Sequence, residues 1–127
     1  MAEAVLDASA ILALVRQESG ADVVGQIIAR SIVSTVNASE AVAKLVQKGV
    51  EPETAEEIIF GLPFQTVDFD REMAAAAGRM WLRGSKAGLS FGDRACLALA
   101  EGSGLPAITT DQQWRRFMTA VEIRYIR

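Results

Sequence analysis

Four acidic residues of this 127-residue chain lie where short apolar segments end or helical ones begin: Asp7, Glu40, Asp93 and Asp111. The chain contains no histidine and one cysteine. This composition excludes Ser-His-Asp triads, Cys-His pairs, imidazole acid–base catalysis, and metal sites built from histidine or several cysteines. Oxygen ligands remain, and hard cations such as Mg²⁺ and Mn²⁺ prefer them. If the protein is an enzyme, its residue types predict carboxylate–metal chemistry.

Short apolar runs alternate with helical patterns along the chain. We expect strands at 5–6, 31–36, 64–67, 105–109 and 121–126. We expect helices at 8–16, 21–30, 37–48, 52–60, 70–83, 91–101 and 112–117, with a loop over 84–90. Uninterrupted apolar strands that alternate with helices favour a parallel sheet covered on both faces. We therefore predict one α/β domain spanning 1–127, a three-layer α/β/α fold around a mostly parallel sheet of four to five strands.

The predicted elements bring the four acids to one edge of the sheet. Asp7 follows the first strand and Asp111 the fourth, while Glu40 and Asp93 lie in the first turns of helices. Ligands of open α/β sheets bind outside the carboxyl ends of the strands. Carboxylates crowded together repel one another, so such a cluster calls for a cation.

Each acid also has an ordinary structural interpretation. The segments 37–40 and 90–93 have the spacing of a capping box, and Asp7 and Asp111 are acceptable helix N-caps. Taken singly, Glu40, Asp93 and Asp111 are better explained as caps. The functional interpretation depends on the whole set. Acids elsewhere are interpreted as first-turn or solvated charges: Glu18, Glu51, Glu53, Glu56, Glu57, Asp70 and Glu72.

Four segments carry a resemblance to a known family: VLDAS (5–9), STVNASE (34–40), LSFGDRACLALA (89–100) and LPAITTD (105–111). Together they resemble PIN-domain ribonucleases, and specifically the VapC-type toxins of bacterial toxin–antitoxin pairs, over essentially the whole chain. The third segment with the following Thr-Thr-Asp is the most specific. Gly92, before Asp93, is a mild departure that leaves the site intact.

The resemblance implies a role for each candidate site residue. Asp7, Glu40 and Asp93 match the family's core acidic positions and Asp111 its fourth. Supporting polar positions fall on Ser9, Asn37 and Thr110. Ser9 and Thr110 either orient carboxylates and waters or make local backbone hydrogen bonds.

The implied activity is metal-dependent endoribonuclease cleavage, with water activated by one or two Mg²⁺ or Mn²⁺ ions. We expect Asp7 and Asp93 to be direct ligands, Glu40 a ligand or base, and Asp111 a second or more distant ligand. Candidate phosphate contacts are the basic residues that flank these acids in sequence: Arg79, Arg83, Lys86, Arg94, Arg115 and Arg116. For any one of them, an ordinary solvated helix face is the favoured interpretation.

The charge balance bears on nucleic-acid binding. With 13 Lys and Arg against 16 Asp and Glu, the formal charge is -3, which argues against strong non-specific binding. Setting aside the four site carboxylates changes that charge from -3 to +1. The acidic balance therefore does not exclude a metal-dependent nuclease.

The resemblance also implies a cognate antitoxin, a small DNA-binding protein with an inhibitory tail that binds near the site. A homodimer or a toxin–antitoxin hetero-oligomer is expected. The N-terminal segment lacks a basic region and is interrupted by Glu3 and Asp7, which argues against a secretory signal. No apolar run is long enough to span a bilayer. We expect a cytoplasmic protein with no membrane partner.

Rival interpretations differ in the residues they need. A phosphoacceptor receiver domain is set aside because Asp7 has no acidic neighbour and no lysine follows Lys86. A phosphatase with an Asp-x-Asp nucleophile would need an acid where Ser9 stands. A non-catalytic PIN-fold binding module and a housekeeping RNA-processing PIN nuclease stay open. Retention of all four acids disfavours the first, and small size without an added RNA-binding domain disfavours the second.

Overall fold

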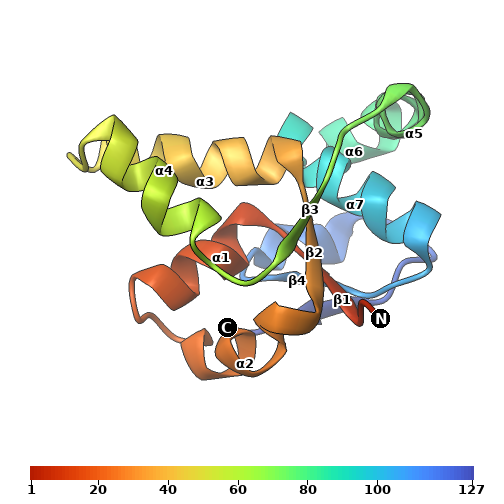
Figure 1. Ribbon diagram of the computed structural model, residues 1–127. Coiled ribbons are helices and arrows are strands. Elements are labelled where there is room, and N and C mark those ends of the chain that lie inside the picture. Colours follow the sequence, from red (N-terminus) through yellow and green to blue (C-terminus); the bar gives the residue numbers. More distant parts are fainter.

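The computed structural model describes all 127 residues as one sheet flanked by helices (Figure 1). The strands are β1 (Ala4–Leu6), β2 (Ser31–Ser34), β3 (Gln65–Val67), β4 (Ala107–Thr109) and β5 (Ile123–Tyr125). They form a single five-stranded sheet in the order β3-β2-β1-β4-β5, and each neighbouring pair is parallel. The predicted α/β class is confirmed, with the sheet wholly rather than mostly parallel.

The connections between strands are helical. The helices are α1 (Ala8–Val15), α2 (Ala21–Ile27), α3 (Thr35–Gln47), α4 (Pro52–Phe60), α5 (Arg71–Arg79), α6 (Trp81–Lys86) and α7 (Phe91–Ser103). Two 3₁₀ turns, η1 (Ile28–Arg30) and η2 (Gln112–Arg116), complete the chain. None of the helices is both long enough and apolar enough to cross a membrane.

The sheet is buried on both faces, so the molecule has two apolar clusters. Successive strand residues point to opposite faces, and in β1 Leu6 belongs to one cluster while Val5 belongs to the other. The first cluster joins the sheet to α1–α4 through residues such as Ile11, Val24, Leu45 and Ile59. The second joins it to α5, α7 and η2 through residues such as Ala77, Leu97 and Trp114. These two clusters account for the three layers in Figure 1.

One boundary shift changes the surroundings of the site. The predicted strand 31–36 ends at Ser34, and α3 begins at Thr35 instead of Asn37. The Ser34 hydroxyl accepts a hydrogen bond from the Val36 N–H at 3.2 Å and so caps the helix. Glu40 therefore lies beyond the first turn of α3. The predicted capping box from Asn37 to Glu40 is wrong.

The predicted helix 70–83 is two helices. The N–H of Met80 bonds to the carbonyl of Ala77, three residues back, at 3.3 Å, and this tighter turn separates α5 from α6. Met80 is buried, whereas Trp81 and Leu82 are exposed. The predicted loop over 84–90 begins only after Lys86, where Gly88 adopts a φ of 78°. The other element ends agree with the prediction to within about two residues, with η1 completing the predicted helix 21–30.

Leu97 and Leu82 are of one residue type and differ in burial, so together they test how much burial contributes to stability. Leu97 is 0% exposed at the centre of the second cluster, whereas Leu82 is 64% exposed on α6. We expect Leu97→Ala to lower the free energy of unfolding by about 2–5 kcal/mol through lost burial and a residual cavity. Leu82→Ala should change it by less than about 0.5 kcal/mol. Urea unfolding of both variants is the measurement, and equal losses would contradict this packing.

Candidate active site

The strand order places the switch point of the sheet between β1 and β4. The chain moves outward in one direction through β2 and β3, and in the other direction through β5. Asp7 directly follows β1, and Asp111 lies two residues after β4. Because ligands of open α/β sheets bind at this point, the topology brings two of the predicted acids to the expected position.

All four predicted acids line one open cavity of about 470 Å³. Its wall is polar, with only two hydrophobic residues among fourteen. The lining residues are Asp7, Ala8, Ser9, Leu12, Arg16, Glu18, Glu40, Lys44, Gly88, Ser90, Asp93, Thr110, Asp111 and Arg127. Ser9 and Thr110 are thus also brought to the cavity, whereas Asn37, Arg83, Lys86 and Arg94 do not line it.

Three hydrogen bonds hold the Asp7 carboxylate in place. It is 4% exposed and accepts bonds from the Ala10 N–H at 2.8 Å, the Ser9 hydroxyl at 2.7 Å and the Thr109 hydroxyl at 2.6 Å. The first of these caps α1. Burial removes water from the charged form and raises the pKa of Asp7 to about 6, although the three bonds oppose the shift. The charge of Asp93 raises this pKa further.

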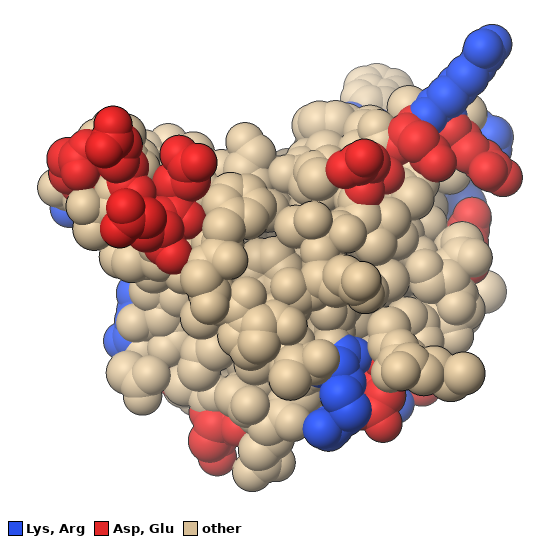
Figure 2. Space-filling view, in the orientation of Figure 1, with Lys and Arg blue, Asp and Glu red and all other residues tan.

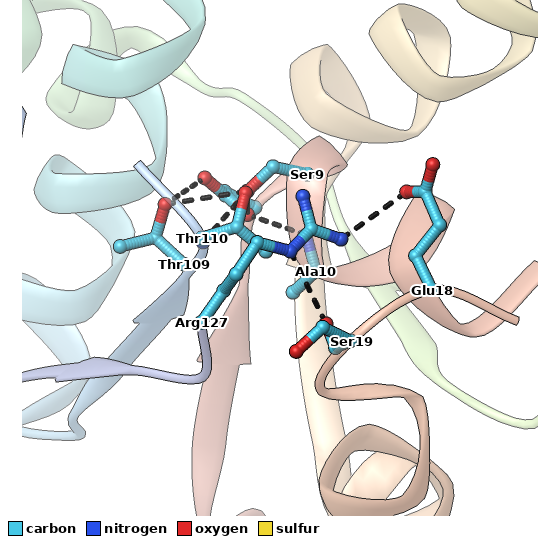
Figure 3. Close-up of polar contacts among 8 residues, drawn as sticks. Ser9, Ala10, Glu18, Ser19, Thr109, Thr110 and Arg127 are labelled. Carbon is cyan, nitrogen blue, oxygen red and sulfur yellow. Dashed lines mark hydrogen bonds and ion pairs between the residues drawn. The ribbon is translucent and has the colours of Figure 1, made fainter. Parts of the chain in front are cut away.

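Thr109 is a site residue that the sequence analysis missed. It is 0% exposed at the end of β4, and its hydroxyl also accepts the Asp111 N–H at 3.0 Å. The Ser9 hydroxyl lies 3.3 Å from it and accepts the Thr110 N–H at 3.0 Å (Figure 3). These bonds join the ends of β1 and β4. Thr110 contributes its backbone N–H, whereas Thr109 contributes its hydroxyl. Because both faces of the sheet are buried, alternation along β4 could not distinguish the two threonines in the sequence.

Asp93 lies in the first turn of α7, as predicted. Its N–H donates to the Ser90 hydroxyl at 3.2 Å, and its carboxylate accepts the Ser90 N–H at 2.8 Å, which completes a capping box. Desolvation raises the pKa of Asp93 against the effect of these bonds, and the charge of Asp111 raises it as well. The buried indole N–H of Trp114 has no partner within hydrogen-bond geometry, yet it lies close enough to Asp93 to favour the ionised form.

Glu40 is held by a contact between α3 and α7. The Asn37 amide, 0% exposed, donates to the Glu40 carboxylate at 3.2 Å and to the Gly92 carbonyl at 2.9 Å. A Cβ placed on Gly92 would lie 2.6 Å from both Glu40 carboxylate oxygens. Gly92 is therefore the residue that leaves room for Glu40. Asn37 acts behind the cavity wall, where it links Glu40 to α7.

The predicted phosphate contacts lie elsewhere. The Arg94 guanidinium donates to the Ala77 carbonyl at 2.9 Å and lies over the Phe91 ring, between α5 and α7. Arg83 lies over Phe117, and Arg115 lies over Tyr125. Neither Arg79, Lys86 nor Arg116 lines the cavity. The basic residues that do line it are Arg16, Lys44 and Arg127, which the sequence analysis did not select.

The donor set fits a hard cation held partly by water. Carboxylate and hydroxyl oxygens line the cavity, and burial of the ionised Asp7 beside Asp93 is a cost that a cation would offset. No group of three or more Cys, Asp and Glu side chains is arranged to hold a metal ion. Mg²⁺ commonly uses only one or two carboxylates and keeps several waters. The arrangement fits that mode of binding and not a cage made only of protein ligands.

Comparison with known proteins agrees with this geometry. The PIN domain model matches residues 4–118. The chain is 34% identical over 114 residues to a VapC ribonuclease of Mycobacterium bovis and to ribonuclease VapC42 of Mycobacterium tuberculosis, covering 82% of this chain and 87% of each relative. The fold matches the DNA-bound VapBC structure from Salmonella typhimurium with a TM-score of 0.78 and 17% identity over the full length of both chains. The resemblance seen in the sequence is confirmed, and the chain belongs to the PIN domain family and, within it, to the VapC ribonucleases.

Proposed function

We propose that this protein is an endoribonuclease that depends on Mg²⁺ or Mn²⁺ and acts as the toxin of a toxin–antitoxin pair. The observation that carries the proposal is the convergence of Asp7, Glu40, Asp93 and Asp111 on one polar cavity at the switch point. The names of the curated relatives support ribonuclease activity. The cavity's oxygen donors support the metal.

Each acid would have a role in metal binding or proton transfer that follows from its surroundings. Asp7 and Asp93 would hold the ion, because their pKa values are raised and a cation would relieve their desolvation. Bound Mg²⁺ or Mn²⁺ would supply a Lewis acid that neutralises charge on the phosphate. Glu40, fixed by Asn37, would accept the proton of the attacking water, and Asp111 would orient water or hold a second ion. Ser9 and Thr109 would keep Asp7 in one orientation.

The proposed partner is a small DNA-binding antitoxin whose tail enters the region of the cavity. The similar structures from Salmonella typhimurium and Rickettsia felis are VapBC complexes bound to DNA. A guanidinium from such a tail would find unpaired carboxylates in the cavity and could replace the cation there. A homodimer stays a prediction from the family resemblance, and a cytoplasmic location stays a prediction from the sequence.

Removing one oxygen ligand tests the catalytic assignment. We expect Asp7→Asn and Asp93→Asn each to lower the rate of Mn²⁺-dependent RNA cleavage by about 100-fold or more, because each loses a charge that holds the cation. Asp68→Asn, which changes an exposed acid outside the cavity, should cleave at the wild-type rate. Cleavage of single-stranded and structured RNA, resolved on denaturing gels, is the measurement. A wild-type protein that cleaves neither substrate, with Asp7→Asn indistinguishable from it, would overturn the proposal.

Metal binding can be measured without catalysis, because Trp114 lies beside Asp93 and the other tryptophan, Trp81, is exposed. In a Trp81→Phe background, Mn²⁺ should quench Trp114 fluorescence in a saturable manner, since the ion is paramagnetic. Asp7→Asn in the same background should weaken the apparent affinity by about 10-fold or more. Quenching of equal strength in both proteins would place the ion outside this cavity.

The raised pKa of Asp7 couples stability to pH and to the cation. The folded protein holds this proton more tightly than the unfolded chain, whose value is near 3.8. Stability without metal is therefore highest below the unfolded value, falls as the pH rises toward about 6, and is then level.

We expect the metal-free wild type to lose on the order of 2–3 kcal/mol relative to Asp7→Asn across this window. Saturating Mg²⁺ should restore much of that loss in the wild type alone, because the ion stabilises the ionised carboxylate. Urea unfolding at a series of pH values, with and without Mg²⁺, is the measurement. Parallel pH profiles for the two proteins would show that Asp7 is not the coupled group.

A further inference from the structure

Three basic residues share the cavity with five acids, which are the four predicted ones and Glu18. Arg16 follows α1, Lys44 lies in the last turn of α3, and Arg127 follows β5. They come from three separate parts of the chain, so their meeting at one cavity is a product of the fold. The sequence gives no spacing that would group them.

Two of these cations are free of acidic partners. The ion pairs of the structure join Arg30 to Glu3, Arg124 to Glu122, and Arg127 to Glu18 at 3.2 Å. Arg16 and Lys44 belong to none of them. A cation at the end of a helix is stabilised by the helix dipole whatever its function, but these two also face an acidic cavity without pairing with its carboxylates.

Arg127 is held in place by several contacts. Its guanidinium bonds to the Glu18 carboxylate at 3.2 Å and to the Ser19 carbonyl at 3.3 Å (Figure 3). Its own carbonyl accepts a bond from the Gln112 amide at 2.5 Å, in the turn that follows Asp111. These contacts tie the chain after β5 to the loop between α1 and α2 and hold the guanidinium at the cavity, paired with Glu18.

The rest of the surface offers no comparable arrangement on the face shown in Figure 2. Acidic side chains gather there over α4 and near α5, with largely uncharged surface between them and no continuous basic area. Arg83, Arg94 and Arg115 lie over aromatic rings. A polyanion directed to the acids therefore meets positive charge within the cavity itself.

We propose that Arg16, Lys44 and Arg127 bind the RNA phosphates next to the one that is cleaved, an inference that rests on the proposed ribonuclease function. The four acids and their cation take the scissile phosphate, while adjacent phosphates carry charge that the acids would repel. The cavity wall has two hydrophobic residues, Ala8 and Leu12, and no aromatic ring on which a base could stack. Contacts here are therefore to the backbone and position the strand without reading its sequence.

The test measures RNA binding apart from cleavage. In an Asp93→Asn background, binding of a fluorescein-labelled single-stranded RNA is followed by anisotropy from 50 to 200 mM salt. Adding Arg16→Gln, Lys44→Gln and Arg127→Gln should weaken binding roughly 100-fold near 0.1 M salt. The slope of log K against log salt should become shallower by about 2, since each phosphate contact contributes about 0.7 for single strands.

A matched control removes the same number of charges outside the cavity. Arg30→Gln, Lys48→Gln and Arg124→Gln, at exposed positions outside the cavity, should together leave the salt slope unchanged. Lys44→Gln alone, at an exposed position of α3, should lower the slope by about 0.7 without a change in fold. An equal effect of the control set, or no effect of the cavity set, would overturn the assignment while leaving the ribonuclease proposal intact. Failure of the parent protein to bind RNA at all would overturn both.

Discussion

The buried carboxylate of Asp7 is the interaction on which the site depends. The Asp7 carboxylate caps α1 by accepting the Ala10 N–H, accepts a hydrogen bond from the Thr109 hydroxyl at the end of β4, and faces the cavity. These contacts need β1 and β4 to be neighbours, which is the arrangement that defines the switch point. Burial makes the negative charge of Asp7 unfavourable. The stability of the fold around Asp7 therefore depends on the proton or cation that neutralises this charge.

A second constraint acts between α3 and α7. The Asn37 amide donates hydrogen bonds to the Glu40 carboxylate and to the Gly92 carbonyl. Gly92 has no side chain that would obstruct the Glu40 carboxylate. The position of Glu40 is therefore set by the Asn37 amide and by the missing side chain of Gly92. This explains how an acid can serve the site from the second turn of its helix and not from a capping position.

The sequence predicted the parallel α/β layers because apolar strands and helices alternate strongly. It predicted that the acids would meet because Asp7 and Asp111 follow strands and Asp93 lies in a capping box, whereas the capping box expected for Glu40 is absent from the structure. It could not predict that Ser34 would end β2, since a β-branched run continues through Val36 and only the competing helix cap decides the boundary. The basic residues that line the cavity could not be selected from the sequence either. Arg83, Lys86 and Arg94 are near the acids in sequence, whereas Arg16, Lys44 and Arg127 reach the cavity only through tertiary packing.

The distribution of charge within the cavity explains how an acidic protein can handle a polyanion. The carboxylates do not form a complete metal cage, and hydrogen bonds hold Asp7 and Asp93 in place. In the proposed mechanism, a proton on Asp7 and a hydrated cation would compete for that one carboxylate, and either would relieve the repulsion between the acids. Arg16 and Lys44 add positive charge to the cavity without pairing with its carboxylates, and Arg127 pairs with Glu18 and not with the four predicted site acids. In the proposed assignment, affinity for a phosphate chain and affinity for the metal are therefore carried by different side chains, and each can be altered separately.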